Sequence, residues 1–262
     1  MPSWGMANSP SGESMTERIV RVLETFTADR TVQTAAEIGR RADLPSSTAH
    51  RIVDELVLAG LLERDDENRV RLGLRLWELA LRGSVALRLR QAALPFMEHV
   101  QARVREHTQL AVLEQDSALF LERLSHPQAG ANITRIAGRL PLHASSSGLV
   151  LLAAAPPAVL DRVLAAPLER LAPETIDDPG MLRRKLAEIR RIGHAVAPGS
   201  IEAVSTGVAV PVRDRGRVVA ALGVVLPRGE QTAAVVAVLR EAAAEIEETL
   251  SRSSTILATF DT

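Results

Sequence analysis

The chain has 262 residues, enough for one large or two modest domains, and 46% of them are hydrophobic. It has no cysteine, which excludes disulfide bonds and thiolate metal sites. The net charge is −1 and the aromatic content is 2%, so composition predicts neither a strongly basic protein nor an aromatic platform for single-stranded nucleic acid. The apolar stretches are short and interrupted, and no secretory signal is visible, which predicts a cytoplasmic protein.

The first elements are short helices. Residues 1–15 mix Ser, Pro, Gly and Asn without a period, which predicts a disordered tail. A helix is expected from Thr16, with an apolar stripe that begins at Ile19. The sequence Thr34-Ala35-Ala36-Glu37 is typical of a capping box. In this motif the Thr hydroxyl accepts a hydrogen bond from the Glu backbone amide, and the Glu carboxylate accepts one from the Thr backbone amide. It predicts the start of a second short helix.

A third helix is expected from about Ser46 to Ala59, after the turn Asp43-Leu44-Pro45. Two short strands, at about 61–63 and 69–72, flank a polar turn. Three helices followed by a hairpin predict a winged helix-turn-helix over residues 16–73. In such a domain the third helix enters the major groove of double-stranded DNA, and the wing lies along the phosphate backbone.

Several polar residues of this domain are predicted to contact DNA, since they lie away from the apolar stripe of the third helix, at the start of the second helix or on the wing. They are Thr34, Ser46, Ser47, Thr48, His50, Arg51, Arg69 and Arg71. The alternative is an ordinary solvated surface. Residues 16–73 hold nine arginines against eleven acidic residues, a net charge of −2. Affinity for DNA must therefore come from how charge is placed on one face.

Residues 74–89 predict an interdomain helix that is apolar on more than one side, and therefore buried against a second copy of the chain. From residue 90 to 262 the pattern mixes helices and strands, with a hairpin signal at Asp214-Arg215-Gly216 and a closing helix from about Ala233 to Leu250. Ile133 to Ile136 is expected to add a strand. The fold class is therefore two-domain, an N-terminal winged helix-turn-helix and a C-terminal α+β domain with an antiparallel sheet.

Two separate blocks resemble the IclR family of bacterial regulators. The first runs from Ala36-Glu37-Ile38 through Pro45-Ser46-Ser47-Thr48-Ala49-His50-Arg51-Ile52 to Arg71-Leu72-Gly73, and the second is Arg139-Leu140-Pro141-Leu142-His143-Ala144-Ser145 with Gly148. The resemblance covers residues 16 to about 250. It implies a GAF-like effector domain, dimers that pair into tetramers, palindromic operators and a small organic effector.

The resemblance and the residue types together predict an effector pocket. A helix that opens at Ser145-Ser146-Ser147 offers amides and hydroxyls to a polar group, although Ser145 can instead be only an N-cap. The predicted effector-binding residues are Ile136, Arg139, Leu140, Leu142, Ser145, Ser146, Ser147, Gly148, Glu202, Val204, Gly207, Gly223 and Val225.

The pocket departs from the family at three positions. Where the family has small polar residues on its last strands, this chain has Gly207, Gly223 and Val225. A roomier and more apolar pocket is therefore expected, with a bulkier or more apolar effector than a short keto acid such as glyoxylate or pyruvate. Without those hydroxyl donors, a small buried carboxylate would be left unpaired at a cost of roughly 1–3 kcal/mol.

The sequence therefore predicts a DNA-binding transcription regulator of a catabolic operon, a repressor rather than an activator, controlled by a small molecule. No cofactor or metal is expected, because the six histidines show no ligand pattern; His99 and His107 lack a third ligand. Two alternatives remain. One is a small-molecule hydrolase built on His143 and its neighbouring serines, although no Gly-x-Ser-x-Gly elbow is present. The other is an architectural DNA binder that senses nothing.

Overall fold

The computed structural model describes residues 13–82, 84–127, 129, 133–229 and 231–260. The chain divides into two compact units, residues 1–84 and 85–262. The elements of the first unit are α1 (Met15–Glu24), β1 (Val32–Thr34), α2 (Ala35–Arg41), α3 (Ser46–Leu58), β2 (Leu62–Arg64), β3 (Arg69–Leu72) and α4 (Leu74–Leu81). Most of the predicted tail lies outside the described residues; its last two, Ser14 and Met15, form the cap and first residue of α1.

The first unit is a winged helix-turn-helix, as predicted. Its helices pack around a core to which α3 contributes Ile52, Val53 and Leu56. Behind them the wing is a three-stranded sheet of order β1-β3-β2. Strand β1 was not predicted, because three residues are too few to show an alternating pattern.

The turn between α2 and α3 depends on two tight features. Gly39 of α2 faces Ala49 of α3 so closely that a Cβ on the glycine would lie 2.9 Å from the alanine Cβ. Asp43 has a φ of 50°, in the left-handed region that Asp tolerates better than most residues. Close contact of the two helices holds α3 at a fixed angle to α2.

The predicted helix over 74–89 is wrong in its extent. Helix α4 ends at Leu81, Arg82 has a non-helical ψ of 78°, and a new helix begins at Val85. No residue of α4 is buried, whereas Leu89 belongs to the core of the second unit. The two halves of the predicted interdomain helix therefore belong to different units.

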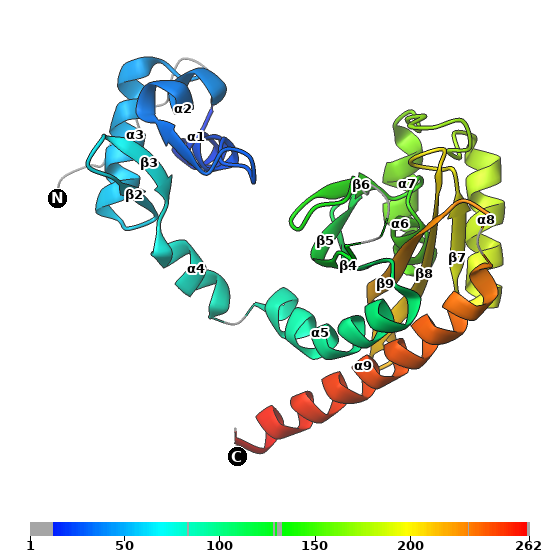
Figure 1. The fold of residues 1–262 in the computed structure, drawn as a ribbon. Helices are drawn as coiled ribbons and strands as arrows, with labels where there is room; N and C mark the ends of the chain where they lie inside the picture. The colour runs from blue at the N-terminus through cyan, green and yellow to red at the C-terminus, as the bar shows by residue number, and fades with distance from the viewer. Residues whose placement is uncertain (1–12, 83, 128, 130–132, 230, 261–262) are drawn as a thin grey trace. The chain divides into compact units, whose positions relative to one another are not determined.

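The second unit continues with α5 (Val85–Val104), β4 (His107–Glu114), β5 (Ser117–Leu124), β6 (Arg139–Pro141), α6 (Ser146–Ala154), α7 (Pro157–Ala165), α8 (Pro179–Ile192), β7 (Ala195–Pro198), β8 (Ser205–Asp214), β9 (Arg217–Pro227) and α9 (Thr232–Phe260). Its strands form one antiparallel sheet of order β6-β5-β4-β9-β8-β7. Helices α5 and α9 cover one face, and α6 covers the other (Figure 1). This is the predicted α+β effector domain.

Helix α6 lies unusually deep in the domain. Its residues from Ser146 to Ala153 are all buried. The helix can pack close to the sheet because the residues of β8 and β9 that face it are small. They are Gly207, Ala209, Ala221 and Gly223. A helix apolar on every side is expected to be buried all round.

One predicted strand is absent. Residues 133–136 form no strand, and the sheet edge is formed instead by β6, which pairs with β5. Ala137, with a φ of 61°, turns the chain just before β6 begins. The predicted hairpin is present between β8 and β9, where Arg215 and Gly216 both have positive φ, as a tight two-residue turn requires.

Candidate effector cavity and DNA-binding face

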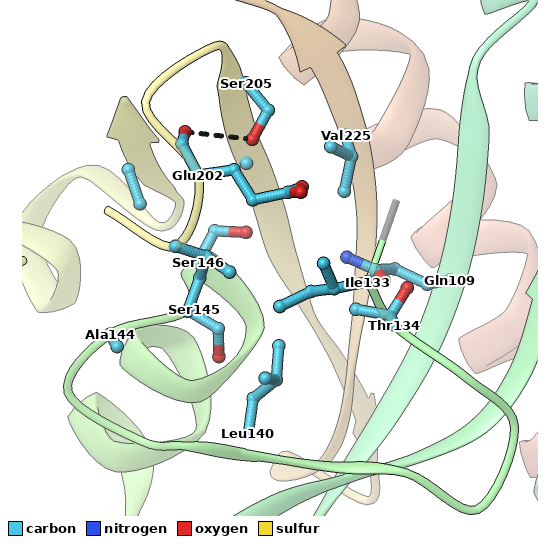
Figure 2. Close-up of a pocket in the computed structure, with 13 residues that line it drawn as sticks. Gln109, Ile133, Thr134, Leu140, Ala144, Ser145, Ser146, Glu202, Ser205 and Val225 are labelled. Atoms are coloured by element: carbon cyan, nitrogen blue, oxygen red, sulfur yellow. Dashed lines mark hydrogen bonds between the residues drawn. The ribbon is translucent and has the colours of Figure 1, made fainter. Parts of the chain in front are cut away.

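A cavity opens between the sheet and the start of α6 and encloses about 390 Å³ of empty space, its open mouth included. Six elements and three loops supply its wall (Figure 2). The lining residues are Gln109, Ile133, Thr134, Leu140, Ala144, Ser145, Ser146, Ala197, Ile201, Glu202, Ser205, Gly207 and Val225.

The start of α6 forms a polar wall of this cavity. The Ser145 hydroxyl accepts a hydrogen bond of 3.0 Å from the Gly148 amide and is therefore the helix N-cap. Ser146 lines the cavity, and its hydroxyl has no hydrogen-bond partner among the described residues. Amides and the helix dipole at this end favour an acceptor or an anion.

Charge in the lining is sparse. Of the lining residues that the structure describes, Glu202 alone is charged, and Figure 2 shows its carboxylate directed into the cavity. The neighbouring Ser205 hydroxyl donates to the Glu202 carbonyl at 3.3 Å.

Six of the predicted effector residues line the cavity: Leu140, Ser145, Ser146, Glu202, Gly207 and Val225. The two predicted apolar walls Ile136 and Val204 are instead 55% and 75% exposed and do not line it. Apolar side chains in loops carry no periodic signal that distinguishes a wall from the surface.

The other predicted effector residues support the wall from behind or lie elsewhere. Leu142, Ser147, Gly148 and Gly223 are buried in the packing of α6. A Cβ on Gly148 would lie 2.6 Å from the Leu142 backbone. Arg139 donates to the Glu114 carbonyl at 3.2 Å and lines a separate cleft on the outer side of Leu140, together with His143 and Arg162.

Neither glycine makes the pocket roomier, contrary to the prediction. Gly207 lines the cavity, but a Cβ there would lie 2.7 Å from the Ser146 side-chain oxygen, so Ser146 already occupies that space. At Gly223 the space is already filled, because a Cβ there would lie 3.2 Å from the Ser147 oxygen and 3.0 Å from the Val208 carbonyl. Gly223 therefore allows α6 to approach the sheet and adds no room for a ligand.

Sequence reasoning missed seven residues of the cavity wall: Gln109, Ile133, Thr134, Ala144, Ala197, Ile201 and Ser205. Ala144 directly precedes the predicted helix start, and only the folded chain brings the other six to α6.

The residues of α3 that were predicted to contact DNA lie mostly on its exposed side. Along α3, Ala49, Ile52, Val53 and Leu56 are buried, and Ser46, Ser47, His50 and Arg51 are exposed on the other side. The N-cap Pro45 has no side chain that bonds to the first turn, so the amides at this end have no side-chain partner. Such a turn can receive a DNA phosphate.

The predicted arginine contacts are paired with acids of the same domain. Arg51 lies 2.8 Å from Glu55, and Arg71 lies 3.0 Å from Glu63. Arg69 pairs with Asp65 and Glu67, and its hydrogen bond to Asp65 raises the pKa of its guanidinium. DNA phosphates must compete with these acidic partners for the arginines. Because the ion pairs are exposed, each contributes little to the stability of the domain.

Thr34 acts first as a helix cap. Its amide donates to Glu37 at 2.8 Å, and its hydroxyl accepts from the Glu37 amide at 3.3 Å. These contacts form the predicted capping box and hold the pKa of Glu37 below its usual value. The Thr34 side chain remains exposed while it makes these contacts.

Across the described ranges, no three His, Asp or Glu side chains gather in a group that would hold a metal ion. No helix within those ranges is both long enough and apolar enough to span a bilayer.

Comparison with known proteins identifies both units. Residues 16–66 match the IclR helix-turn-helix domain, and residues 84–248 match the C-terminal domain of the bacterial transcriptional regulator IclR. The chain belongs to the IclR family of bacterial transcriptional regulators.

Individual IclR relatives cover nearly the whole chain. An IclR homolog from Microbacterium hydrocarbonoxydans, crystallised in complex with 4-hydroxybenzoate, is 64% identical with a TM-score of 0.87, over 90% of this chain and 99% of its own. The transcriptional regulator XynR of Escherichia coli is 30% identical over 79% of this chain and 83% of its own length. The Pca regulon regulatory protein of Pseudomonas putida is 27% identical over 79% and 72%. These relatives are transcriptional regulators and not enzymes, which rules against the hydrolase alternative.

Proposed function

We propose that this IclR regulator represses a catabolic operon by binding operator DNA through α3, and that a small aromatic acid controls that binding. The main support for DNA binding is the exposed side of α3. It carries Ser46, Ser47, His50 and Arg51, on the side away from the buried residues of the helix. Occupying an operator is enough to block polymerase, whereas activation needs a further contact, so repression is the proposed sign. The protein acts in the cytoplasm, with its DNA.

The first turn of α3 is proposed to receive a phosphate, with Ser46, Ser47 and Thr48 around it. Arg51 and His50, one turn further on, reach base edges, and Arg69 and Arg71 follow the backbone from the wing. Each arginine exchanges an acidic partner of its own domain for DNA.

The proposed effector is an aromatic carboxylic acid of the 4-hydroxybenzoate type. Support comes from the relative that is 64% identical and was crystallised with that compound. The cavity agrees with this chemistry, because Leu140, Ile133 and Val225 give apolar walls and the start of α6 gives a polar end.

A second copy of the chain is the proposed partner of α4. The helix has eight residues and none of them is buried, although it carries Leu74, Leu79 and a Trp77 that is 61% exposed. An isolated helix of this length is not stable in water, and an apolar patch of this kind marks an interface. Pairing would also place two copies of α3 on successive half-sites of a palindromic operator, about 34 Å apart.

Fluorescence anisotropy with the upstream region of its own gene and of neighbouring promoters tests the DNA proposal. We expect specific binding that weakens about tenfold or more in Arg51→Gln. Arg191→Gln, which removes one exposed arginine from α8, is the matched control and leaves binding unchanged. Failure to find any specific site at these promoters contradicts the proposal.

Calorimetry with the full chain tests the effector. We expect 4-hydroxybenzoate to bind and to change operator affinity, and Ser146→Ala to weaken that binding about tenfold. Glyoxylate and pyruvate should bind far more weakly. Tight binding of either keto acid, or stable operator binding that no aromatic acid alters, would reject the proposed effector class; the latter result is expected of an architectural binder.

A further inference from the structure

The side-chain amide group of Gln109 lies in the wall of the effector cavity without a hydrogen-bond partner among the described residues. The residue is only 4% exposed, and it lies in β4 at the centre of the sheet. Its side-chain oxygen is fully shielded, and no hydrogen bond within the described residues involves its amide. Buried amides are nearly always paired, so an unpaired one at a cavity points to a partner that arrives from outside.

The strand pattern explains why this side chain faces the cavity. Leu110 of β4 belongs to the core under α5 and α9, whereas Ala111 belongs to the core under α6. Because successive residues of a strand face opposite sides, Gln109 lies on the α6 side. It pairs across the sheet with Gly223, and the Ser147 side chain of α6 packs against that glycine.

The cavity is therefore polar at two separate places. One is the start of α6, where Ser146 packs against Gly207 of β8. The other is Gln109 of β4, and β9 lies between β4 and β8. Neighbouring strands are about 4.8 Å apart, so the two polar places are separated by roughly two strand spacings. Figure 2 shows the Gln109 amide beside Ile133 and Thr134, away from Ser145 and Ser146.

The amides and dipole of α6 favour a ligand carboxylate at the start of that helix. Gln109 offers both a donor and an acceptor, which matches a group that also has both, such as a hydroxyl.

We infer that Gln109 is the residue that selects a hydroxyl group on the effector ring, opposite the carboxylate held at the start of α6. The inference rests on the proposed effector class and adds the residue that recognises the ring hydroxyl. The hydroxyl accepts from the amide nitrogen and donates to the amide oxygen or to the Glu202 carboxylate. An acid without the hydroxyl leaves the amide buried and unpaired.

The test compares benzoate, 4-fluorobenzoate and 4-hydroxybenzoate by calorimetry on the full chain. We expect wild type to bind 4-hydroxybenzoate at least about tenfold more tightly than the other two acids. In Gln109→Leu, which keeps the volume and removes the amide, the preference should fall below about threefold. Most of the change should be loss of affinity for 4-hydroxybenzoate.

Thr108→Val is the matched control. Thr108 is the neighbour of Gln109 in β4, is fully buried and also has an unpaired side-chain oxygen, but it does not line the cavity. Removing that oxygen should leave the hydroxyl preference at its wild-type value. Circular dichroism verifies the fold of each variant, and Gln109→Met replaces Gln109→Leu if the latter does not fold.

The outcomes separate this inference from the proposed function. If wild type binds all three acids within about threefold of one another, or if Gln109→Leu and Gln109→Met keep the tenfold preference, Gln109 does not select the hydroxyl, and the aromatic effector class stands. If wild type binds none of the three acids, both the effector class and the role of Gln109 are overturned.

Discussion

A Cβ on Gly207 would lie 2.7 Å from the side-chain oxygen of Ser146, so glycine in β8 and serine at the start of α6 fit only as a pair. The contact couples the shape of the effector cavity to the packing of α6. Gly207→Ala forces the serine or the helix to move, and overpacking of this kind costs about 1–3 kcal/mol. We expect that loss of stability in urea unfolding, together with weaker effector binding.

Ser146→Ala provides the internal control for this contact. It removes the clashing oxygen, although its own Cβ would still lie 3.2 Å from the new Cβ at position 207. The double variant, Gly207→Ala with Ser146→Ala, should therefore lose less stability than the two single variants lose in sum. The expected difference in the free energy of unfolding is at least about 0.5 kcal/mol. Additive effects would mean that Gly207→Ala acts through something other than this contact.

Gly39→Ala tests the helix-turn-helix. Replacing glycine by alanine inside a helix normally gains about 0.5–1 kcal/mol. Here the new Cβ would lie 2.9 Å from that of Ala49, so the expected overpacking cost of about 1–3 kcal/mol exceeds the gain. Thermal unfolding should show a less stable domain, and anisotropy should show weaker operator binding because α3 is displaced. The exchange Gly39→Ala with Ala49→Gly should recover part of both losses; a stabilised single variant would contradict the argument.

The stability of the first unit should depend on pH in part through the ionisation of Glu37. Hydrogen bonds from the Thr34 amide and hydroxyl lower the pKa of this carboxyl in the folded state. A lowered folded pKa adds stability that is present above the unfolded pKa and is lost as pH falls through the folded pKa. We therefore expect Glu37→Gln to be less stable than wild type at neutral pH, and the difference to close in acid. Chemical unfolding across that range measures it, and a gap that stays constant with pH would refute it.

Local sequence patterns predicted the first unit almost entirely. The capping box at Thr34 and the buried stripe from Ala49 to Leu56 depend on residues three or four apart, so a helix periodicity defines them. The limits of such patterns show at residues 74–89, where a continuous apolar sequence hides the break after Leu81. Neither the exposure of α4 nor the burial of Leu89 is visible in periodicity.

The effector cavity was predictable only in part, because its wall is not local. Ser145 and Ser146 were found through a helix-start signal, and Gly207 through its departure from a family pattern. Gln109, Thr134 and Ser205 meet them only because the sheet order brings β4 and β8 to either side of β9. Gly223 was misassigned for the same reason, since no sequence pattern shows that Ser147 already fills the space beside it.

Glu55 is expected to limit the affinity of α3 for DNA. It lies one helical turn after Arg51, 2.8 Å from its guanidinium, and both side chains are about half exposed. Its charge repels phosphate and holds Arg51 against the helix. Glu55→Gln should therefore tighten operator binding by about two- to fivefold at low salt, an effect that salt screens. Anisotropy titrations at two salt concentrations measure this change.

Glu188→Gln is the control for net charge, since it removes one exposed acid from α8 of the other unit, where Glu188 pairs with Lys185 at 3.1 Å. It should leave DNA affinity unchanged. A further variant, Arg51→Gln with Glu55→Gln, should lose the gain, because the released arginine is then missing. If Glu55→Gln tightens binding equally with and without Arg51, the effect comes from general charge rather than from release of this arginine, and α3 does not use Arg51 as proposed.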